Sequence, residues 1–171
     1  MKKIIETHRL LIREFNLSDA PFIVALLNSP GWLRFIGDRG VHTEEDAQNY
    51  LLNGPMKSYQ ANGFGLWRVS LKSDDSPIGM CGLLKRDTLD DPDIGFAMLP
   101  EFAQNGYAFE MADATMRLAK TDFDMGRVVA ITDAENERSI ALLLKIGLAF
   151  EKTIQFPGAD ETLLLFGSKE Q

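Results

Sequence analysis

Residues 93–110 read Asp-Ile-Gly-Phe-Ala-Met-Leu-Pro-Glu-Phe-Ala-Gln-Asn-Gly-Tyr-Ala-Phe-Glu, and this stretch decides the fold. Its first part, residues 93–99, places Ile94, Phe96 and Met98 on one face, which predicts a strand. Pro100 ends that strand, because proline has no N–H to donate to a sheet. A loop follows, and then a long helix to about residue 122.

The helix carries an apolar stripe at helical spacing. The stripe consists of Ala108, Met111, Ala112, Thr115, Leu118 and Ala119. A loop that opens a helix presents free backbone N–H groups, and together with the helix dipole they form a site for an anion. Gly106 lets a ligand approach the backbone closely, and the small Ala108 does not block it. Taken alone, the pattern is equally typical of an ordinary strand-to-helix turn.

Outward from this segment, the chain predicts the element order β-α-α-β-β-β-α-β-α-β-β. We expect strands over residues 4–15, 64–72, 77–84, 127–132, 148–156 and 162–168. We expect helices over residues 19–28 and 43–61, and a third helix that Asn136 caps and Gly147 ends. Residues 1–171 are therefore predicted to form one α+β domain. Its mostly antiparallel central sheet should contain one parallel pair, at the helical crossover.

Composition narrows the class of protein. The net charge of −7 argues against nucleic acid, whose phosphates such a surface would repel. No apolar run reaches the roughly 20 residues that a membrane helix needs, and charge returns too early for a signal peptide. We therefore expect a cytoplasmic protein. Cys81 is expected to pack in the core rather than act as a nucleophile, and His8 and His42 lack the spacing of metal ligands, so no metal is expected.

Residues 93–110 resemble the cofactor-binding segment of the GNAT superfamily of N-acetyltransferases. They most resemble the branch that acetylates the N-termini of ribosomal proteins. Further segments resemble the family in its own order: residues 7–13 its opening strand, residues 78–83 its third strand, and residues 136–147 its Asn-x-x-Ser helix. The resemblance covers nearly the whole chain and implies the GNAT-type acyl-CoA N-acyltransferase fold, with a mixed sheet flanked by helices.

The chain departs from the family at the pyrophosphate loop, which usually reads Gln/Arg-x-x-Gly-x-Gly/Ala with another glycine two residues before the central one. Ala103 stands at the Gln/Arg position, and Gln104 stands at the additional glycine. Gly106 and Ala108 match. Backbone N–H groups make most of the phosphate contacts in this family, so we expect the site to bind acetyl-CoA.

The resemblance implies roles for residues on both sides of the expected cofactor site. Backbone groups near Met98 and Leu99 would bond the pantetheine amides, and Asn136 would contact the cofactor arm. The pyrophosphate would be held by Gln104, Asn105, Gly106, Tyr107 and Ala108. Lys145 would reach the nucleotide end.

Two residues are candidates for catalysis. Ser139 lies where the family places the hydroxyl that protonates the leaving thiolate; the alternative is a helix residue that bonds nearby backbone. Asp93 is a candidate for taking a proton from the amine through water; the alternative is an exposed carboxylate that ends an acidic turn. A backbone N–H near Met98 would stabilise the oxyanion.

The expected activity is acetyl transfer from acetyl-CoA to a primary amine, either of a small molecule or of a protein N-terminus. The alternative is a domain that binds CoA or a protein without catalysis. Trp32, Phe35 and Trp67 are candidates for an acceptor pocket or for the core, and the two N-terminal helices and the hairpin at Pro157 should shape that pocket. The sequence leaves open whether the protein is a monomer or a homodimer.

Overall fold

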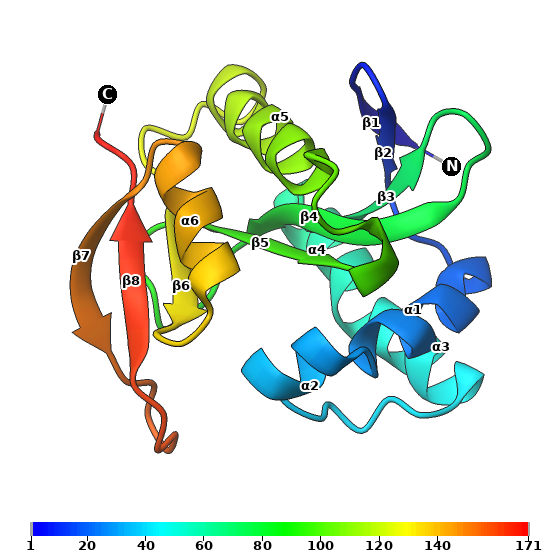
Figure 1. Cartoon of the computed structure of the whole chain (residues 1–171), viewed down its shortest axis with the longest axis horizontal. Coiled ribbons are helices and arrows are strands. Elements are labelled where there is room, and N and C mark those ends of the chain that lie inside the picture. The colour runs from blue at the N-terminus through cyan, green and yellow to red at the C-terminus, as the bar shows by residue number, and fades with distance from the viewer. Residues whose placement is uncertain (1, 171) are drawn as a thin grey trace.

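The computed structural model describes residues 2–170, which form one mixed sheet of eight strands covered by helices (Figure 1). The strands are β1 (Lys3–Glu6), β2 (Leu10–Arg13), β3 (Leu66–Leu71), β4 (Pro77–Leu84), β5 (Asp93–Met98), β6 (Val129–Asp133), β7 (Ala149–Ile154) and β8 (Leu163–Gly167). The helices are α1 (Ala20–Leu27), α2 (Pro30–Phe35), α3 (Glu44–Asn53), α4 (Pro55–Asn62), α5 (Tyr107–Thr121) and α6 (Glu137–Lys145). Two short 3-10 helices are η1 (Leu17–Asp19) and η2 (Pro100–Phe102).

The strand order in the sheet is β1-β2-β3-β4-β5-β6-β8-β7. Neighbours are antiparallel except for β5 and β6, which α5 joins as a parallel pair. The predicted α+β class, the mostly antiparallel sheet and the helical crossover are confirmed. No described helix is long and apolar enough to span a bilayer.

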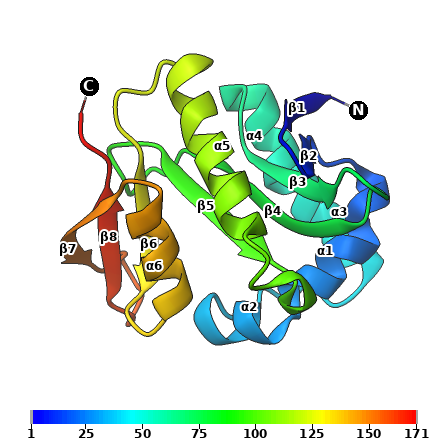
Figure 2. The ribbon, with the colours of Figure 1, turned by 45° about the horizontal axis from the view of Figure 1, so that its top comes forward.

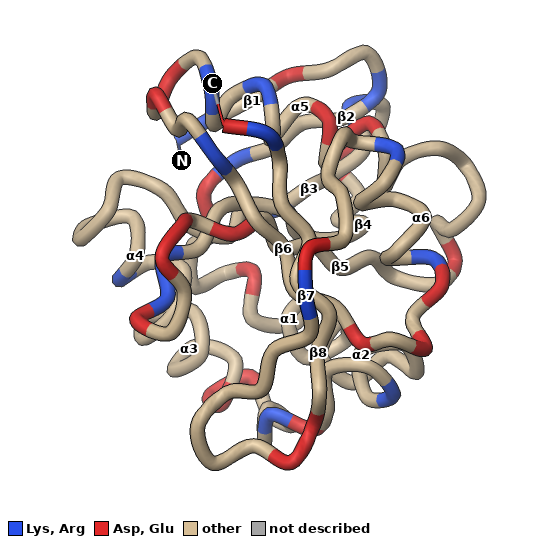
Figure 3. Tube along the Cα trace, turned by 90° about the vertical axis from the view of Figure 1, so that its left-hand side faces the viewer, with Lys and Arg blue, Asp and Glu red and all other residues tan. Residues whose placement is uncertain are grey.

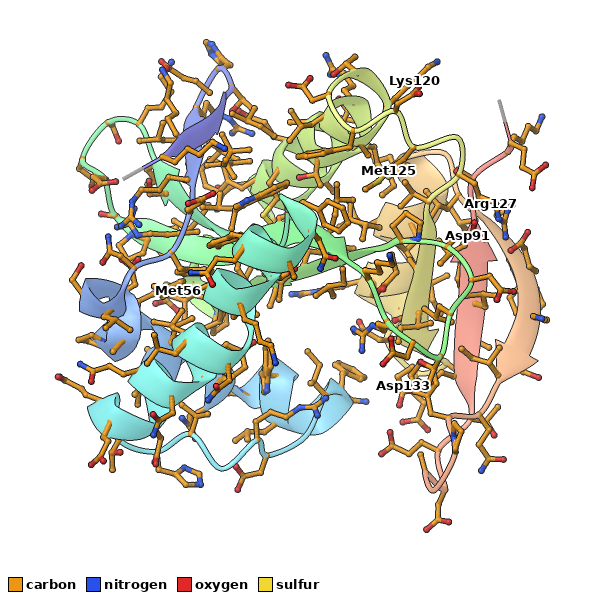
Figure 4. The ribbon with its side chains drawn as sticks, turned by 180° about the vertical axis from the view of Figure 1, so that it is seen from behind. Met56, Asp91, Lys120, Met125, Arg127 and Asp133 are labelled. Atoms are coloured by element: carbon orange, nitrogen blue, oxygen red, sulfur yellow. The ribbon has the colours of Figure 1, made fainter. Side chains whose placement is uncertain are left out.

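The helices cover both faces of the sheet. α5 crosses β4 and β5 on one face and α6 lies beside β6 on the same face (Figure 2), whereas α3 and α4 cover the opposite face (Figure 4). Successive side chains of β4 face opposite sides of the sheet and pack into two different clusters of the core. The Sγ atom of Cys81 contacts Thr115 Oγ1 of α5 at 3.3 Å, whereas Met80 packs into a second cluster with α1 and α3.

Cys81 is fully buried, and burial raises the pKa of its thiol to about 12. The expectation that it packs in the core is therefore confirmed. A thiol with this pKa carries almost no thiolate at neutral pH, and only the thiolate is strongly nucleophilic.

Two of the predicted elements were wrong in detail, and one helix was not predicted. The strand expected over residues 4–15 is a hairpin, in which β1 pairs with β2 from Lys3 and Arg13 inward. The helix expected over residues 43–61 is two helices, because Gly54 has a non-helical backbone and Pro55 lacks the N–H that would continue the ladder. The helix that was not predicted is α2, which begins with Pro30.

Close packing of β3 on β4 requires glycine at residue 82. A Cβ added there would lie 2.0 Å from the carbonyl oxygen of Gly65 and 2.7 Å from Leu66 Cα, and neither backbone atom can rotate away. We expect Gly82→Ala to lower the free energy of unfolding by about 2–3 kcal/mol in chemical denaturation.

Gly31→Ala in α2 is the matched control, since a Cβ there meets nothing within 4 Å and alanine favours a helix. Equal stability of the Gly82→Ala protein and the unchanged chain would contradict the close approach of the two strands.

Candidate functional site

The two parallel strands separate after one pairing. Asp93 of β5 pairs with Val129 of β6, and beyond this point the strands diverge (Figure 1). On its other edge β5 pairs with β4 along its whole length, from Asp93 opposite Leu84 to Met98 opposite Gly79. The edge of β5 that faces β6 therefore offers backbone N–H and C=O groups for which no strand is present.

The two residues expected to bond pantetheine differ in their backbone partners. Leu99 donates its N–H to the carbonyl of Ile78 at 2.8 Å, and its own carbonyl accepts the N–H of Phe102 at 3.1 Å. Successive residues of a strand direct these groups to opposite edges, so Met98 directs its N–H toward the open edge. Met98 can therefore meet a ligand with its backbone, whereas the backbone groups of Leu99 are already bonded.

The start of α5 lies at the open end of the two strands. Gly106 precedes the first turn with a left-handed backbone (φ 79°), and no side chain of residues 2–170 caps the helix. The N–H groups of Tyr107 and Ala108 therefore lack partners within the helix and are oriented for an anion.

Gln104 also has a left-handed backbone, with a φ of 65°. This geometry explains why glycine is usual at this position in similar loops, since a side chain there costs about 1–2 kcal/mol. The loop keeps this left-handed conformation although residue 104 is glutamine and not glycine.

A residue that the sequence reasoning missed holds this loop. Arg9, in the turn between β1 and β2, donates from Nη1 to the carbonyl of Asn105 at 2.8 Å, and its guanidinium lies 4.4 Å from the ring centroid of Tyr107. It also donates from Nε to Glu110 of α5 at 2.7 Å. Arg9 thus places a positive charge beside a loop in which Ala103 supplies none. Its position in the segment similar to the family's opening strand was the available signal.

Glu110 joins the first hairpin to the helix start. Its carboxylate accepts the hydroxyl of Thr7 at 2.6 Å and the backbone N–H of Arg9 at 2.8 Å, in addition to Arg9 Nε. Burial acts to raise the pKa of Glu110, but these hydrogen bonds and the charge of Arg9 outweigh it and leave the pKa lowered. We call the three residues Thr7, Arg9 and Glu110 the hairpin clamp.

A groove of about 810 Å³ lies beside the clamp, between the β1–β2 hairpin and α5. Gly106 and Lys145 both line it, and Lys145 Nζ lies 4.4 Å from the ring centroid of Phe109. The structure therefore brings Lys145 of α6 to the groove that begins at the candidate pyrophosphate loop.

Asn136 and Ser139 lie at the start of α6, which follows β6. The Asn136 side chain accepts the backbone N–H of Ser139 at 3.2 Å, so the predicted helix cap is confirmed. The Ser139 hydroxyl makes no hydrogen bond to any residue within 2–170 and is partly exposed. Its alternative role, bonding nearby backbone through the hydroxyl, is not what the structure shows.

Asp93 is buried, with 1% of its side chain exposed. Both its carboxylate oxygens accept from Arg86 Nε at 3.2 Å. Burial raises the pKa of Asp93, and the charge and hydrogen bond of Arg86 oppose the rise. The alternative interpretation of Asp93 as an exposed carboxylate is wrong. Asp93 is paired with Leu84, as Ala97 is with Met80, and therefore faces the side of α1–α4.

The three aromatic candidates for an acceptor pocket differ in burial. Trp67 is fully buried in the cluster under α5, 6.4 Å from the ring centroid of Phe123. Trp32 is 8% exposed within the cluster of α1 and α3, so the core interpretation holds for both tryptophans. Phe35 is half-buried, with the Arg34 guanidinium 4.6 Å from its ring centroid.

Two further hollows lie on the α1–α4 side of the sheet. One, of about 460 Å³, is lined by Arg39, Asp46, Asn49, Tyr50 and Asn53, among others. The other, of about 760 Å³, lies between the β4–β5 loop and the β7–β8 hairpin and includes Pro157. There Arg127 binds Asp91 at 3.1 Å (Figure 4), and it also pairs with Glu151 of β7, which is the edge strand of the sheet. Within residues 2–170, no group of three or more His, Cys, Asp or Glu side chains could hold a metal ion.

Known proteins share this architecture. A family model described as an acetyltransferase (GNAT) domain matches residues 9–149. The uncharacterized N-acetyltransferase YnaD of Bacillus subtilis (strain 168) is 31% identical over 147 residues, which are 86% of this chain and 83% of YnaD.

Solved structures agree in fold. An acetyltransferase of the GNAT family from Bacillus anthracis has a TM-score of 0.78 at 25% identity and covers 95% of this chain and 96% of its own. RimL, a ribosomal L7/L12 alpha-N-protein acetyltransferase solved in complex with coenzyme A, has a TM-score of 0.83 at 15% identity, over 97% of each chain. At that identity the likeness to RimL shows the fold alone.

Because the pKa of Glu110 is lowered, the contribution of the hairpin clamp to the free energy of unfolding should depend on pH. The folded-state pKa of Glu110 is lowered from 4.5, so its ionised form stabilises the fold above pH 4.5, and this stabilisation is lost as the pH falls through the lowered value. We expect Glu110→Gln to lower the free energy of unfolding by about 2 kcal/mol at pH 7, because hydrogen bonds to a charged group are lost.

The difference between Glu110→Gln and the unchanged chain should shrink below about pH 4 in urea titrations at a series of pH values. Glu101→Gln, an exposed glutamate of η2, is the control. A difference that stays constant from pH 7 to pH 3 would show that the charge of Glu110 has no part in the clamp.

Proposed function

The chain belongs to the GNAT acetyltransferase family, and on that premise we propose that it transfers the acetyl group of acetyl-CoA to a primary amine by direct attack in a ternary complex. The acceptor is the amine of a small molecule or of a protein N-terminus. The observation that carries the proposal is the divergence of β5 and β6, which ends at the uncapped start of α5.

In this proposal the open edge of β5 holds the pantetheine arm of acetyl-CoA, and the start of α5 holds its pyrophosphate. The open edge of β5 at Met98 bonds the pantetheine amides, with Leu99 fixing the strand against β4. The pyrophosphate lies against the backbone of Gln104, Asn105, Gly106, Tyr107 and Ala108, with Arg9 beside the loop. Asn136 contacts the arm from α6, and Lys145 meets the nucleotide in the groove beside Phe109. A free strand edge and an uncapped helix start fit such a ligand, because both offer unpaired backbone groups.

The chemistry needs a neutral amine and a stabilised oxyanion. The amine nitrogen attacks the thioester carbon, and another backbone N–H on the open edge of β5, near Met98, donates to the oxygen on which charge develops. The carbon–sulfur bond then breaks, and the Ser139 hydroxyl gives its proton to the departing thiolate. Asp93, at the far end of β5 from Met98, accepts the proton of the amine through intervening water molecules, since the buried carboxylate does not reach the cleft itself.

Binding of acetyl-CoA is tested by thermal melting. A ligand present at 100 times its dissociation constant stabilises the folded state by about 2.7 kcal/mol, which is about 5–10 °C for a chain of this size. We expect that rise, followed by release of free thiol when an acceptor amine is added. Buried Cys81 gives the thiol assay a low background.

No rise in melting temperature at millimolar acetyl-CoA would overturn the proposed site. A rise without turnover on any amine would favour the alternative, a domain of this fold that binds CoA without catalysis.

The two catalytic candidates are tested by substitution. We expect Ser139→Ala to lower kcat about 100-fold with little change in KM, because general acid catalysis contributes at least that factor. Asp93→Asn should lower kcat and remove the acidic limb of the pH–rate profile, since the raised pKa of Asp93 sets that limb. Ser73→Ala, in the exposed β3–β4 turn, is the control for Ser139→Ala. Unchanged turnover in either variant would eliminate the role of that residue.

A further inference from the structure

Arg86 is a fixed guanidinium beside Asp93, the proposed proton acceptor. It follows β4 directly and is anchored through Nε by both oxygens of Asp93. Asp93 in turn marks the point where β5 and β6 part. A guanidinium held by a buried carboxylate keeps its direction, so it can recognise a ligand without first losing side-chain freedom.

The binding end of Arg86 is free. Within residues 2–170, neither terminal nitrogen of its guanidinium has a hydrogen-bond partner, although the side chain is 39% exposed and that of Asp93 only 1%. The two terminal nitrogens of an arginine match the two oxygens of a carboxylate. The structure therefore shows an arginine whose anchor is satisfied and whose outer end can accept an anionic group.

A hollow of about 460 Å³ lies on the side of the sheet that Asp93 faces. Arg39 and Tyr50 line it, whereas Arg86 and Asp93 do not. Burial raises the pKa of the Tyr50 hydroxyl, and the charges of Arg39 and Arg86 both act to lower it.

The hollow also contains one acidic residue, whose lowered pKa keeps it ionised. Asp46 lines the same space, but its Oδ2 atom accepts the backbone N–H groups of His42 and Thr43 at 3.0 Å as part of the α3 cap. The remaining polar groups are the side-chain amides of Asn49 and Asn53. A volume of 460 Å³ is in the range of sites for small molecules.

We propose that Arg86, anchored by Asp93, binds a carboxylate on the acceptor, so that the acceptors are small amines of the amino-acid type. This inference rests on the proposed acetyl transfer and names the substrate class of the same site. The reaction is unchanged: the amine displaces CoA from the acetyl group, and the carboxylate only orients the amine. Simple polyamines, which carry only positive charge, are disfavoured by the same arginine.

The test compares each amino acid with its decarboxylated amine. Suitable pairs are leucine with isopentylamine, phenylalanine with phenethylamine, and lysine with cadaverine. We expect the unchanged enzyme to have a kcat/KM at least about 10-fold higher for the amino acid in at least one pair. Arg86→Gln also removes the partner of Asp93 and should therefore lower kcat for both members of a pair alike. In addition it should raise KM for the amino acid about 10- to 100-fold more than KM for the paired amine.

Two controls accompany Arg86→Gln. Lys120→Gln removes an exposed positive charge on α5, outside the candidate site, and should leave the preference within a pair unchanged. Arg86→Lys keeps the charge without the paired nitrogens and should fall between Arg86→Gln and the unchanged enzyme. The acetyl-CoA melting shift of each variant reports whether its fold and cofactor site are intact.

Each outcome separates this inference from the proposed function. If the unchanged enzyme acetylates amines but prefers the decarboxylated partners or peptide N-termini, the inference is wrong and acetyl transfer stands. If Arg86→Gln lowers kcat/KM equally for both members of a pair, Arg86 serves only to neutralise Asp93, and the inference is wrong. If Arg86→Gln does not fold, the preference of the unchanged enzyme for an amino acid over its amide decides the matter. If no amine is acetylated at all, the proposed function itself fails.

Discussion

One backbone pairing, between Asp93 and Val129, fixes the point at which two parallel strands separate. Each of the diverging strands is held from its outer side: β5 by its ladder to β4, and β6 by its ladder to β8. Neither strand can move to close the divergence without losing those ladders. The polar groups along the opening must therefore be satisfied by water or by a ligand, and the sheet itself keeps a binding site open.

The other end of the site depends on residues nearly a hundred positions away in the sequence. The turn between β1 and β2 holds the first turn of α5 through the hairpin clamp, and Arg9 also holds the preceding loop through Asn105. That loop contains Gln104 in a left-handed conformation, which is unfavourable for a residue with a side chain. Strain of this kind persists only where the surroundings determine the backbone, and the hairpin clamp supplies that constraint.

The sequence predicted features that arise from nearby residues. The strand from Pro77 to Leu84, the cap at Asn136 and the helical crossover were all correct. The β1–β2 turn was missed because it lacks the glycine or proline that marks most turns and is held by Glu110, far away in sequence. The helix break at residues 54 and 55 had a readable Gly-Pro signal. The burial of Asp93 had none, since it depends on how the chain folds over that end of β5.

Net charge does not describe the charge within a cleft, for a physical reason. The charge of −7 belongs to the whole surface, where acidic and basic residues are interspersed (Figure 3), and the field inside a cleft depends on the few groups that face it. Beside Asp93 the nearby charge is the guanidinium group of Arg86. Nearby positive charge lowers the pKa of an ammonium group. The arginine that would orient a carboxylate would therefore also favour the neutral amine, which is the form that can attack the thioester.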